Sequence, residues 1–476
     1  MTDQPGIDPV RLQAALDVLR DLDDLSTDHP DAVRIREATA AVYKSVKIRR
    51  RREARDRILA NDNAVTAATA TAAPGRIDDE TRGLPIGEAT GAQVIGTLIN
   101  ARSCYVCKQR YREVDAFYHQ LCPSCAELNH AKRDARTDLT GRRALLTGGR
   151  AKIGMYIALR LLRDGADTTI TTRFPTDAVR RFRAMPDSDQ WLHRLTIVGI
   201  DLRDPAQVVA LADSVAAKGP LDVLINNAAQ TVRRTPGSYA QLIAAESVAL
   251  PPGPMPEVVD LGHGPLQLTQ GESTEQHSFD AHNLTALALT SGSASLDRVA
   301  AGTAIDAGGL VPDLDAVNSW TQRVHEVDAL ELLEVQLCNV TAPFVLVSRL
   351  RPSLAASPAR RTYVVNVSAM EGQFSRGYKG PGHPHTNMAK AALNMLTRTS
   401  AREMLESDGI LMTSVDTGWI TDERPHPTKS RLADEGFHAP LDLVDGAARV
   451  YDPIVRGEAG DDVFGVFLKD YSPSPW

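Results

Sequence analysis

Short apolar runs alternate with helical segments from about residue 138 onward, and this alternation limits the fold more than any other feature of the chain. Residues 143–147 form an apolar run that leads into a glycine-rich turn at 148–154 and then into a helical segment at 155–163. Further strands are predicted at 167–173, 195–202, 221–228, 361–368 and 412–418. Strands that alternate with helices pair into a parallel sheet covered by helices on both faces. The sequence therefore predicts an α/β fold with a doubly wound parallel sheet.

A strand, a glycine-rich turn and a helix in this order can hold a pyrophosphate, because backbone amides at the helix N-terminus point at the anion. The candidate contacts in this turn are Thr147, Gly148, Arg150, Lys152, Ile153 and Gly154. The turn by itself is not specific, and the residues that follow it along the chain decide the interpretation.

Those residues occur in a recognisable order: Thr147-Gly148…Gly154, Asp201, Asn226-Asn227-Ala228, Asn339, Asn366-Val-Ser368, Lys390 and Gly418. This order resembles the short-chain dehydrogenase/reductase family over residues 138–476, apart from an insertion at about 231–315. The resemblance implies a Rossmann-type sheet that binds NAD(P) at the carboxyl ends of its strands. It also implies cofactor contacts at Asp201, which faces the adenine, and at Leu202, Asn227, Ala228, Lys390 and Gly418. A homo-oligomer and a small-molecule substrate are expected on the same ground.

The residues after the second strand of this sheet favour NADP over NAD. An NAD site usually places an acid there to accept a hydrogen bond from the ribose 2′-hydroxyl. This chain has Thr172-Arg173 instead, with no acid before Asp177. Arg173 can pair with a 2′-phosphate through charge-assisted hydrogen bonds, and Arg150 lies in the nearby turn. Lys152 replaces the family's middle glycine, where its side chain either obstructs the pyrophosphate or contacts it.

The catalytic positions depart from the family. Its Tyr-x-x-x-Lys pair becomes Thr386 and Lys390, and its orienting serine becomes Ala369, whereas Asn339 matches. An aliphatic hydroxyl does not ionise near neutral pH, so Thr386 is a poor general acid. The candidates for a replacement acid are His385, Tyr378 and His383, in that order, and the alternative is an exposed loop with incidental polar residues.

Two functions remain open on this basis. The first is an NADP-dependent oxidoreductase that acts on an unknown carbonyl or alcohol. The second is a non-catalytic NADP-binding scaffold or sensor that binds a protein partner through a helical N-terminal region (residues 1–63), a zinc-binding module (residues 101–137) or the insertion. The insertion is rich in Pro, Gly, Ser and Thr, as at 251–254 and 291–295, which is typical of a lid, a partner-binding arm or disorder. A helix from Trp320 to Leu337 is expected after it.

Four cysteines form two Cys-x-x-Cys pairs, Cys104 with Cys107 and Cys122 with Cys125, separated by 14 residues. This spacing is typical of a structural zinc site, in which each pair supplies two thiolates to a tetrahedron. The alternatives are a redox dithiol or unrelated thiols. His130 is a spare nitrogen ligand that we expect to be solvated. Residues 101–137 are therefore predicted to be a small zinc-binding module.

The N-terminal region is predicted to be helical over residues 1–63, with Asp8-Pro9 at the first helix start. It ends in a basic stretch that suits an acidic partner, nucleic acid or simply solvent: Lys44, Lys47, Arg49, Arg50, Arg51, Arg52, Arg55 and Arg57. Residues 64–100 are expected to be a linker, since 64–75 are low in complexity.

The charge and composition of the chain argue against several classes of protein. The net charge of −7, from 53 basic and 60 acidic residues, argues against a nucleic-acid binder with a basic surface. No apolar run approaches the roughly 18 residues of a membrane span, and the N-terminus lacks a signal-peptide pattern. Five cysteines are too few for a disulfide scaffold. A cytoplasmic protein is expected.

Overall fold

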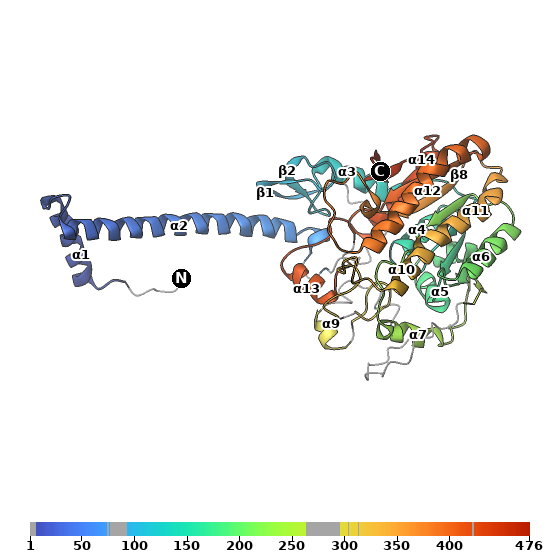
Figure 1. The fold of residues 1–476 in the computed structure, drawn as a ribbon, viewed down its shortest axis with the longest axis horizontal. Helices are drawn as coiled ribbons and strands as arrows, with labels where there is room; N and C mark the ends of the chain where they lie inside the picture. Colours follow the sequence, from blue (N-terminus) through green and yellow to red (C-terminus); the bar gives the residue numbers. More distant parts are fainter. Residues whose placement is uncertain are drawn as a thin grey trace. The chain divides into compact units, whose positions relative to one another are not determined.

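The computed structural model describes residues 6–73, 76, 93–262, 296–302, 304–312, 314–420 and 423–476. Its main sheet has nine strands in the order β11-β10-β9-β8-β6-β3-β4-β5-β7 (Figure 1). All neighbours are parallel except β10 and β11. The strands are β3 Arg143–Leu146, β4 Asp167–Thr172, β5 Leu195–Gly199, β6 Val223–Asn226, β7 Glu257–Asp260, β8 Thr362–Ser368, β9 Ile410–Asp416, β10 Phe467–Lys469 and β11 Ser472–Ser474. The predicted doubly wound parallel sheet is confirmed.

Helices cover both faces of this sheet, because successive strand residues point to opposite sides. Ala144 and Leu146 of β3 pack with α4, α5 and α14, whereas Leu145 packs with α6, α11 and α12. From β3 onward, the helices in the described ranges are α4 Lys152–Arg163, α5 Pro175–Arg183, α6 Pro205–Ala217, α7 Ala240–Glu246, α9 Leu296–Ala300, α10 Ala329–Gln336, α11 Ala342–Ala355, α12 Pro384–Asp408, α13 His426–Asp434 and α14 Leu443–Glu458. The carboxyl ends of the parallel strands thus lie between two helical layers, where cofactors bind in such folds.

Part of the insertion at 231–315 is regular structure that the sequence analysis did not predict. It contributes α7 and the edge strand β7, which pairs with β5. Glu257 of β7 accepts a hydrogen bond from Thr196 of β5 at 2.8 Å and pairs with Lys218 at 2.8 Å. The local sequence does not predict this strand, because the strand forms by pairing with β5, which lies about 60 residues earlier in the chain. The segment 291–295, singled out for its composition, lies outside the described residues.

The helix expected from Trp320 to Leu337 begins later, at Ala329. Asp328 caps it, because its carboxylate accepts hydrogen bonds from the backbone of Leu330 at 2.8 Å and of Glu331 at 3.2 Å. The helix then continues through one π-helical turn at Leu337–Thr341 into α11.

This continuous stretch, Ala329–Ala355, is long and apolar enough to cross a membrane by length and composition alone, the one such helix in the described ranges. No run of that kind was expected from the sequence. Leu346, Leu350 and Leu354 belong to the core beneath the sheet, where α11 packs against α6. A core helix passes the same test of length and composition, so the finding is weak support for a membrane span.

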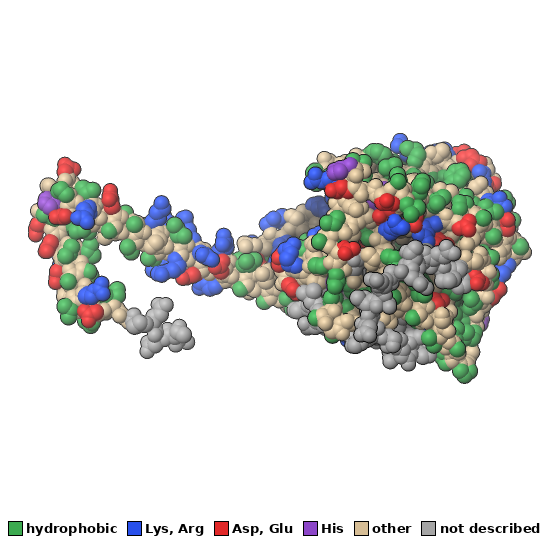
Figure 2. All heavy atoms as spheres, turned by 60° about the horizontal axis from the view of Figure 1, so that its bottom comes forward, with side chains coloured by type: hydrophobic (Ala, Val, Ile, Leu, Met, Phe, Trp, Pro, Cys, Tyr) green, Lys and Arg blue, Asp and Glu red, His purple; other side chains and the backbone are tan. Residues whose placement is uncertain are grey.

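The N-terminal helices are α1 Pro9–Asp21 and α2 Pro30–Ala67. The predicted cap is confirmed, since the Asp8 carboxylate accepts hydrogen bonds from the Val10 and Arg11 amides at 3.1 and 3.0 Å. Figure 2 shows lysine and arginine side chains along α2, and all eight cations of the basic stretch are exposed. Helix α2 and strand β1 both extend into the range 64–100 that was expected to be a linker.

The cysteine-rich segment consists of β1 Val94–Ser103, β2 Arg110–Asp115 and α3 Pro123–Asp134, and β1 and β2 form an antiparallel pair. Helix α3 packs against α14. Arg133 of α3 forms ion pairs with Asp442 at 2.6 Å and with Asp445 at 3.0 Å, and the Tyr118 hydroxyl donates to Asp445 at 2.6 Å. Buried ion pairs and hydrogen bonds therefore join this segment to the last helix of the sheet domain.

Candidate functional site

The glycine-rich turn between β3 and α4 is held by the end of β6. The Thr147 hydroxyl accepts hydrogen bonds from the backbone amides of Asn227 and Ala228, both at 3.0 Å. The Asn227 amide group donates to the carbonyls of Thr147 at 3.0 Å and of Gly148 at 3.1 Å. Four of the predicted cofactor residues therefore form one rigid turn at the carboxyl edge of the sheet.

Gly154 is required by this packing. A Cβ atom at residue 154 would lie 2.0 Å from the Gly148 carbonyl oxygen and 2.8 Å from Asn227 Nδ2. We expect Gly154→Ala to displace the turn, to lower the free energy of unfolding by about 1–3 kcal/mol, and to weaken dinucleotide binding. Thermal unfolding and cofactor titration measure the two effects. Gly377→Ala is the control, since a Cβ there meets nothing within 4 Å, and an equal effect of both changes would contradict the argument.

The two cations of the turn contact the end of the insertion. Arg150 pairs with the buried carboxylate of Asp177, and its Nη2 donates to the Gly308 carbonyl at 2.9 Å. Lys152 has a left-handed φ of 53°, which is the backbone conformation that a glycine favours. Its ammonium group lies 3.5 Å from the Asp306 carboxylate. Residues 306–308 of the insertion therefore lie against the predicted pyrophosphate turn, and Arg150 is engaged in an internal ion pair.

Arg173 follows β4 directly and is half-buried. Its guanidinium lies over the rings of Tyr239 at 5.2 Å and Phe174 at 5.7 Å, and Nη2 donates to the Tyr239 hydroxyl at 3.4 Å. Within the described residues, no carboxylate forms an ion pair with it. The arginine predicted to bind a 2′-phosphate thus contacts two aromatic rings.

Asp201 lies at the end of β5, as expected of an adenine contact, but its carboxylate pairs with Arg203 at 2.5 Å. Burial acts to raise the pKa of Asp201, and the hydrogen bonds from Arg203 outweigh this and hold it below its ordinary value. Leu202 belongs to one hydrophobic core, and Ile153 is partly buried against the other.

The first turn of α12 carries the most unusual polar groups of the site. Thr386 and His385 are each 2% exposed, and the Thr386 hydroxyl and both His385 ring nitrogens have no hydrogen-bond partner in the described part of the chain. Lys390, one turn further on, donates from Nζ to the Val367 carbonyl at 2.8 Å. Burial lowers the pKa of Lys390 to about 8. Buried polar atoms without protein partners are candidates for hydrogen bonds with a bound ligand.

The other predicted catalytic residues are placed differently. Tyr378 is 74% exposed in the loop before α12. The His383 ring stacks on Trp320 with centroids 3.8 Å apart, and its Nδ1 lies 2.9 Å from the Trp320 carbonyl. Asn339 lies in the π-helical turn, where its amide donates to the Gln230 carbonyl at 2.9 Å and accepts from the Gln230 amide at 2.8 Å. Of the three acid candidates, only His385 is buried near Thr386 and Lys390.

Three carboxylates near this turn were missed in the sequence. Glu331 of α10 lies 3.8 Å from His385 Nε2, and Glu371 and Asp416 act electrostatically on Lys390. Burial raises the pKa of Asp416 to about 6, and its Oδ2 atom has no partner among the described residues. Asp416 ends a strand at the binding edge, which is a signal that sequence reasoning could have used. Glu331 carried no signal, because α10 was predicted to start elsewhere.

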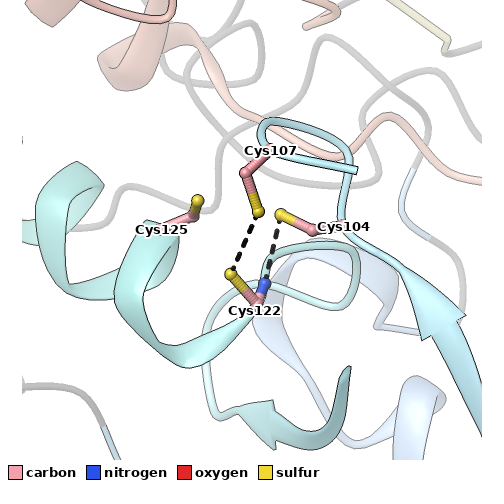
Figure 3. A group of neighbouring side chains, drawn as sticks. All are labelled: Cys104, Cys107, Cys122 and Cys125. Carbon is pink, nitrogen blue, oxygen red and sulfur yellow. Dashed lines mark hydrogen bonds between the residues drawn. The ribbon is translucent and has the colours of Figure 1, made fainter. Parts of the chain in front are cut away.

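The four cysteines come together at the second candidate site (Figure 3). Their Sγ atoms all lie within 4.8 Å of one another, and the Sγ atoms of Cys107 and Cys122 are 3.6 Å apart. None of the cysteines forms a disulfide in the described residues. Four thiolates at Zn–S distances of about 2.3 Å would be about 3.8 Å apart, so the donor set fits a tetrahedral zinc ion.

His130 is not solvated as expected. It is 8% exposed, and its Nε2 lies 3.1 Å from the Asp115 carboxylate. The Asp115 carboxylate also accepts hydrogen bonds from the amides of Phe117 and Tyr118. His130 therefore supports the loop between the two cysteine pairs from outside the thiol cluster.

Comparison with known proteins agrees with this architecture. Residues 142–245, from the start of β3 through β6 into α7, match the family model described as short chain dehydrogenase. "Uncharacterized protein R665" of Acanthamoeba polyphaga mimivirus is 29% identical over 368 residues, which are 74% of this chain and 71% of that protein. A "Probable oxidoreductase" of Streptomyces antibioticus is 40% identical over 94 residues, which are 19% of this chain and 30% of that protein.

Among solved structures, a short chain dehydrogenase from Burkholderia cenocepacia J2315 in complex with NADP is similar with a TM-score of 0.44. It is 20% identical, and the match covers 70% of this chain and 97% of that chain. The glycine turn and the parallel sheet define a Rossmann-type α/β protein, and the family-model match over residues 142–245 agrees with this fold. Residues 142–245 of this chain are thus similar to short chain dehydrogenases.

Proposed function

We propose that this protein is an NADP-dependent oxidoreductase that interconverts a carbonyl and an alcohol, with His385 in place of the family's tyrosine acid. The observation that supports it best is the buried first turn of α12. There the His385 nitrogens and the Thr386 hydroxyl lack hydrogen-bond partners among the described residues, one turn from Lys390. Leaving such groups unsatisfied costs about 1–3 kcal/mol each, which a bound substrate and cofactor would recover.

Each of these residues has a distinct role in the proposed reduction. Bound NADPH supplies the hydride that reaches the carbonyl carbon. The His385 imidazolium donates its proton to the carbonyl oxygen, so that an alcohol forms and the imidazole becomes neutral. The Thr386 hydroxyl donates a hydrogen bond to the same oxygen, and Lys390 binds the ribose hydroxyls. Glu331, at 3.8 Å, favours the protonated ring of His385.

A second function is favoured by other observations. The tyrosine and serine of the family are Thr386 and Ala369 in this chain, and both cations of the glycine turn have internal acidic partners. A protein that binds NADP(H) without catalysis, and binds a partner through the insertion or through residues 101–137, here called the cysteine module, would carry these features.

Binding and turnover distinguish the two. The purified full chain is titrated with NADPH by fluorescence and then assayed for NADPH oxidation with a panel of aldehydes and ketones. Turnover supports the oxidoreductase, and tight binding without turnover on any substrate supports the non-catalytic binder. Absence of NADPH and NADH binding would contradict both.

Arg173 provides a test of the cofactor. We expect Arg173→Ala to weaken NADPH binding by about 1–2 kcal/mol, because a half-exposed charge-assisted contact to the 2′-phosphate is lost. NADH lacks this phosphate and serves as the control ligand, so its Kd should change little. Equal weakening of both cofactors in calorimetric titrations would mean that Arg173 does not bind the 2′-phosphate.

We propose, in addition, that Cys104, Cys107, Cys122 and Cys125 bind one structural zinc ion. The convergence of four thiol groups supports this site, and a complete set of protein ligands leaves no open position for catalysis.

A further inference from the structure

Tyr105 lies between the first two cysteines and points out of the thiol cluster, toward the loop that follows β9. Its hydroxyl oxygen accepts a hydrogen bond from the Trp419 backbone amide at 2.9 Å. Trp419 follows Gly418, which the family resemblance makes a cofactor contact. A residue between the first two cysteines therefore forms a hydrogen bond with the backbone next to the predicted cofactor contact Gly418.

The same loop is held from two more sides. The Asp416 carboxylate accepts a hydrogen bond from the Gly418 amide at 3.0 Å. Gly418 has a φ of 80°, and a Cβ there would lie 2.5 Å from Leu441 and 3.3 Å from the Arg449 guanidinium. The side chains of Leu441 and Arg449 therefore lie directly against Gly418.

Arg449 is itself held by the cysteine module. It is 2% exposed, and its Nη2 donates to the Asn129 side chain of α3 at 2.9 Å and to Asp470 at 3.0 Å. Helix α3 begins between the third and fourth cysteines. The module thus contacts the loop directly, through the hydrogen bond of Tyr105 to Trp419. It also contacts the loop indirectly, because Asn129 binds Arg449, which lies against Gly418.

We propose that Tyr105 is a positioning residue through which the cysteine module fixes the Gly418–Trp419 segment, so that the metal state of the module sets the affinity for NADP(H). The part of this inference that concerns the affinity for NADP(H) rests on the proposed function. Loss of the metal would release the turn from Cys104 to Cys107, and the Tyr105 hydroxyl would no longer be fixed opposite the Trp419 amide.

Hydrogen exchange of the full chain tests the positioning without any cofactor. In Tyr105→Phe the Trp419 amide loses its acceptor, and we expect the peptide that contains it to exchange about 5- to 10-fold faster. The Kd for NADPH should rise about 5-fold, with kcat changed less than KM and zinc content unchanged. Removal of zinc with a chelator should accelerate exchange of the same peptide.

Tyr111→Phe is the matched control, because the Tyr111 hydroxyl is buried in the same module but donates to the His119 carbonyl at 2.8 Å. It should leave Trp419 exchange and the Kd for NADPH as in the wild type. Unchanged Trp419 exchange in Tyr105→Phe would overturn the inference whatever the cofactor does. Faster exchange with an unchanged Kd would overturn the link to the cofactor. A wild type that binds no NADPH would instead refute the proposed function, while exchange still tests the positioning.

Discussion

His385→Ala is expected to slow the reduction step by about 10²-fold, the usual contribution of a general acid. The ring is buried on the first turn of α12, neither of its nitrogens has a hydrogen-bond partner in the described part of the chain, and the family's tyrosine is absent. Single-turnover oxidation of bound NADPH measures the step directly. The Kd for NADPH should stay near its wild-type value, because the proposed role of His385 concerns the proton alone.

The pH dependence follows from the same histidine. Burial lowers the pKa of His385 below its ordinary value of about 6.5, and the neighbouring Glu331 only partly opposes this. The protonated ring is the acid, so the reduction rate should be highest at low pH and fall as the pH rises through this lowered pKa. The transition is therefore expected at a lower pH than the range of about 6–7.5 that an unperturbed histidine would give.

Tyr378→Phe is the control, since its hydroxyl is on a side chain that is 74% exposed. It should retain full activity. If His385→Ala also retains full activity, the proton comes from another group, and Asp416, whose pKa burial raises to about 6, is the next candidate to replace.

The double change Cys104→Ser/Cys107→Ser is expected to remove the zinc and to lower the free energy of unfolding by several kcal/mol. A segment this small has little core of its own, and metal binding supplies folding free energy in such modules. The ion pairs of Arg133 and the hydrogen bond of Tyr118 to α14 depend on its order. Elemental analysis should change from about one zinc per chain to nearly none, and urea denaturation should show the lost stability.

Cys338→Ser is the matched control for this change. Cys338 is the fifth cysteine and lies in the π-helical turn outside the cluster. Its replacement should leave the zinc content unchanged. A wild-type protein that is fully folded and contains no zinc would refute the site.

Much of the sheet could be predicted from the sequence because its signals are local. Residues 143–147 and 361–368 are apolar runs whose strand character does not depend on distant partners, and β3 and β8 occupy nearly these ranges. The edge strand β7 could not be predicted, because Glu257–Asp260 becomes a strand only by pairing with β5.

The candidate site divides in the same way. The positions of Gly154, Thr386, Lys390 and the four cysteines follow from spacing and from the family pattern. The contacts between side chains in the site do not follow from spacing or from the family pattern. The ion pair of Arg150 with Asp177, the stacking of His383 on Trp320 and the exposure of Tyr378 all depend on loops packed by distant segments.

The sequence by itself determined the parallel α/β sheet, the glycine turn and the cysteine pairs, since helix and strand periodicity and ligand spacing are encoded within short stretches. Only the tertiary structure decided that His385 is the buried acid candidate, that residues 306–308 lie on the glycine turn, and that Tyr105 bonds to Trp419. These contacts join residues more than 50 positions apart, or depend on burial created by such contacts. No local pattern specifies them, because their energy is gained only when the whole domain packs.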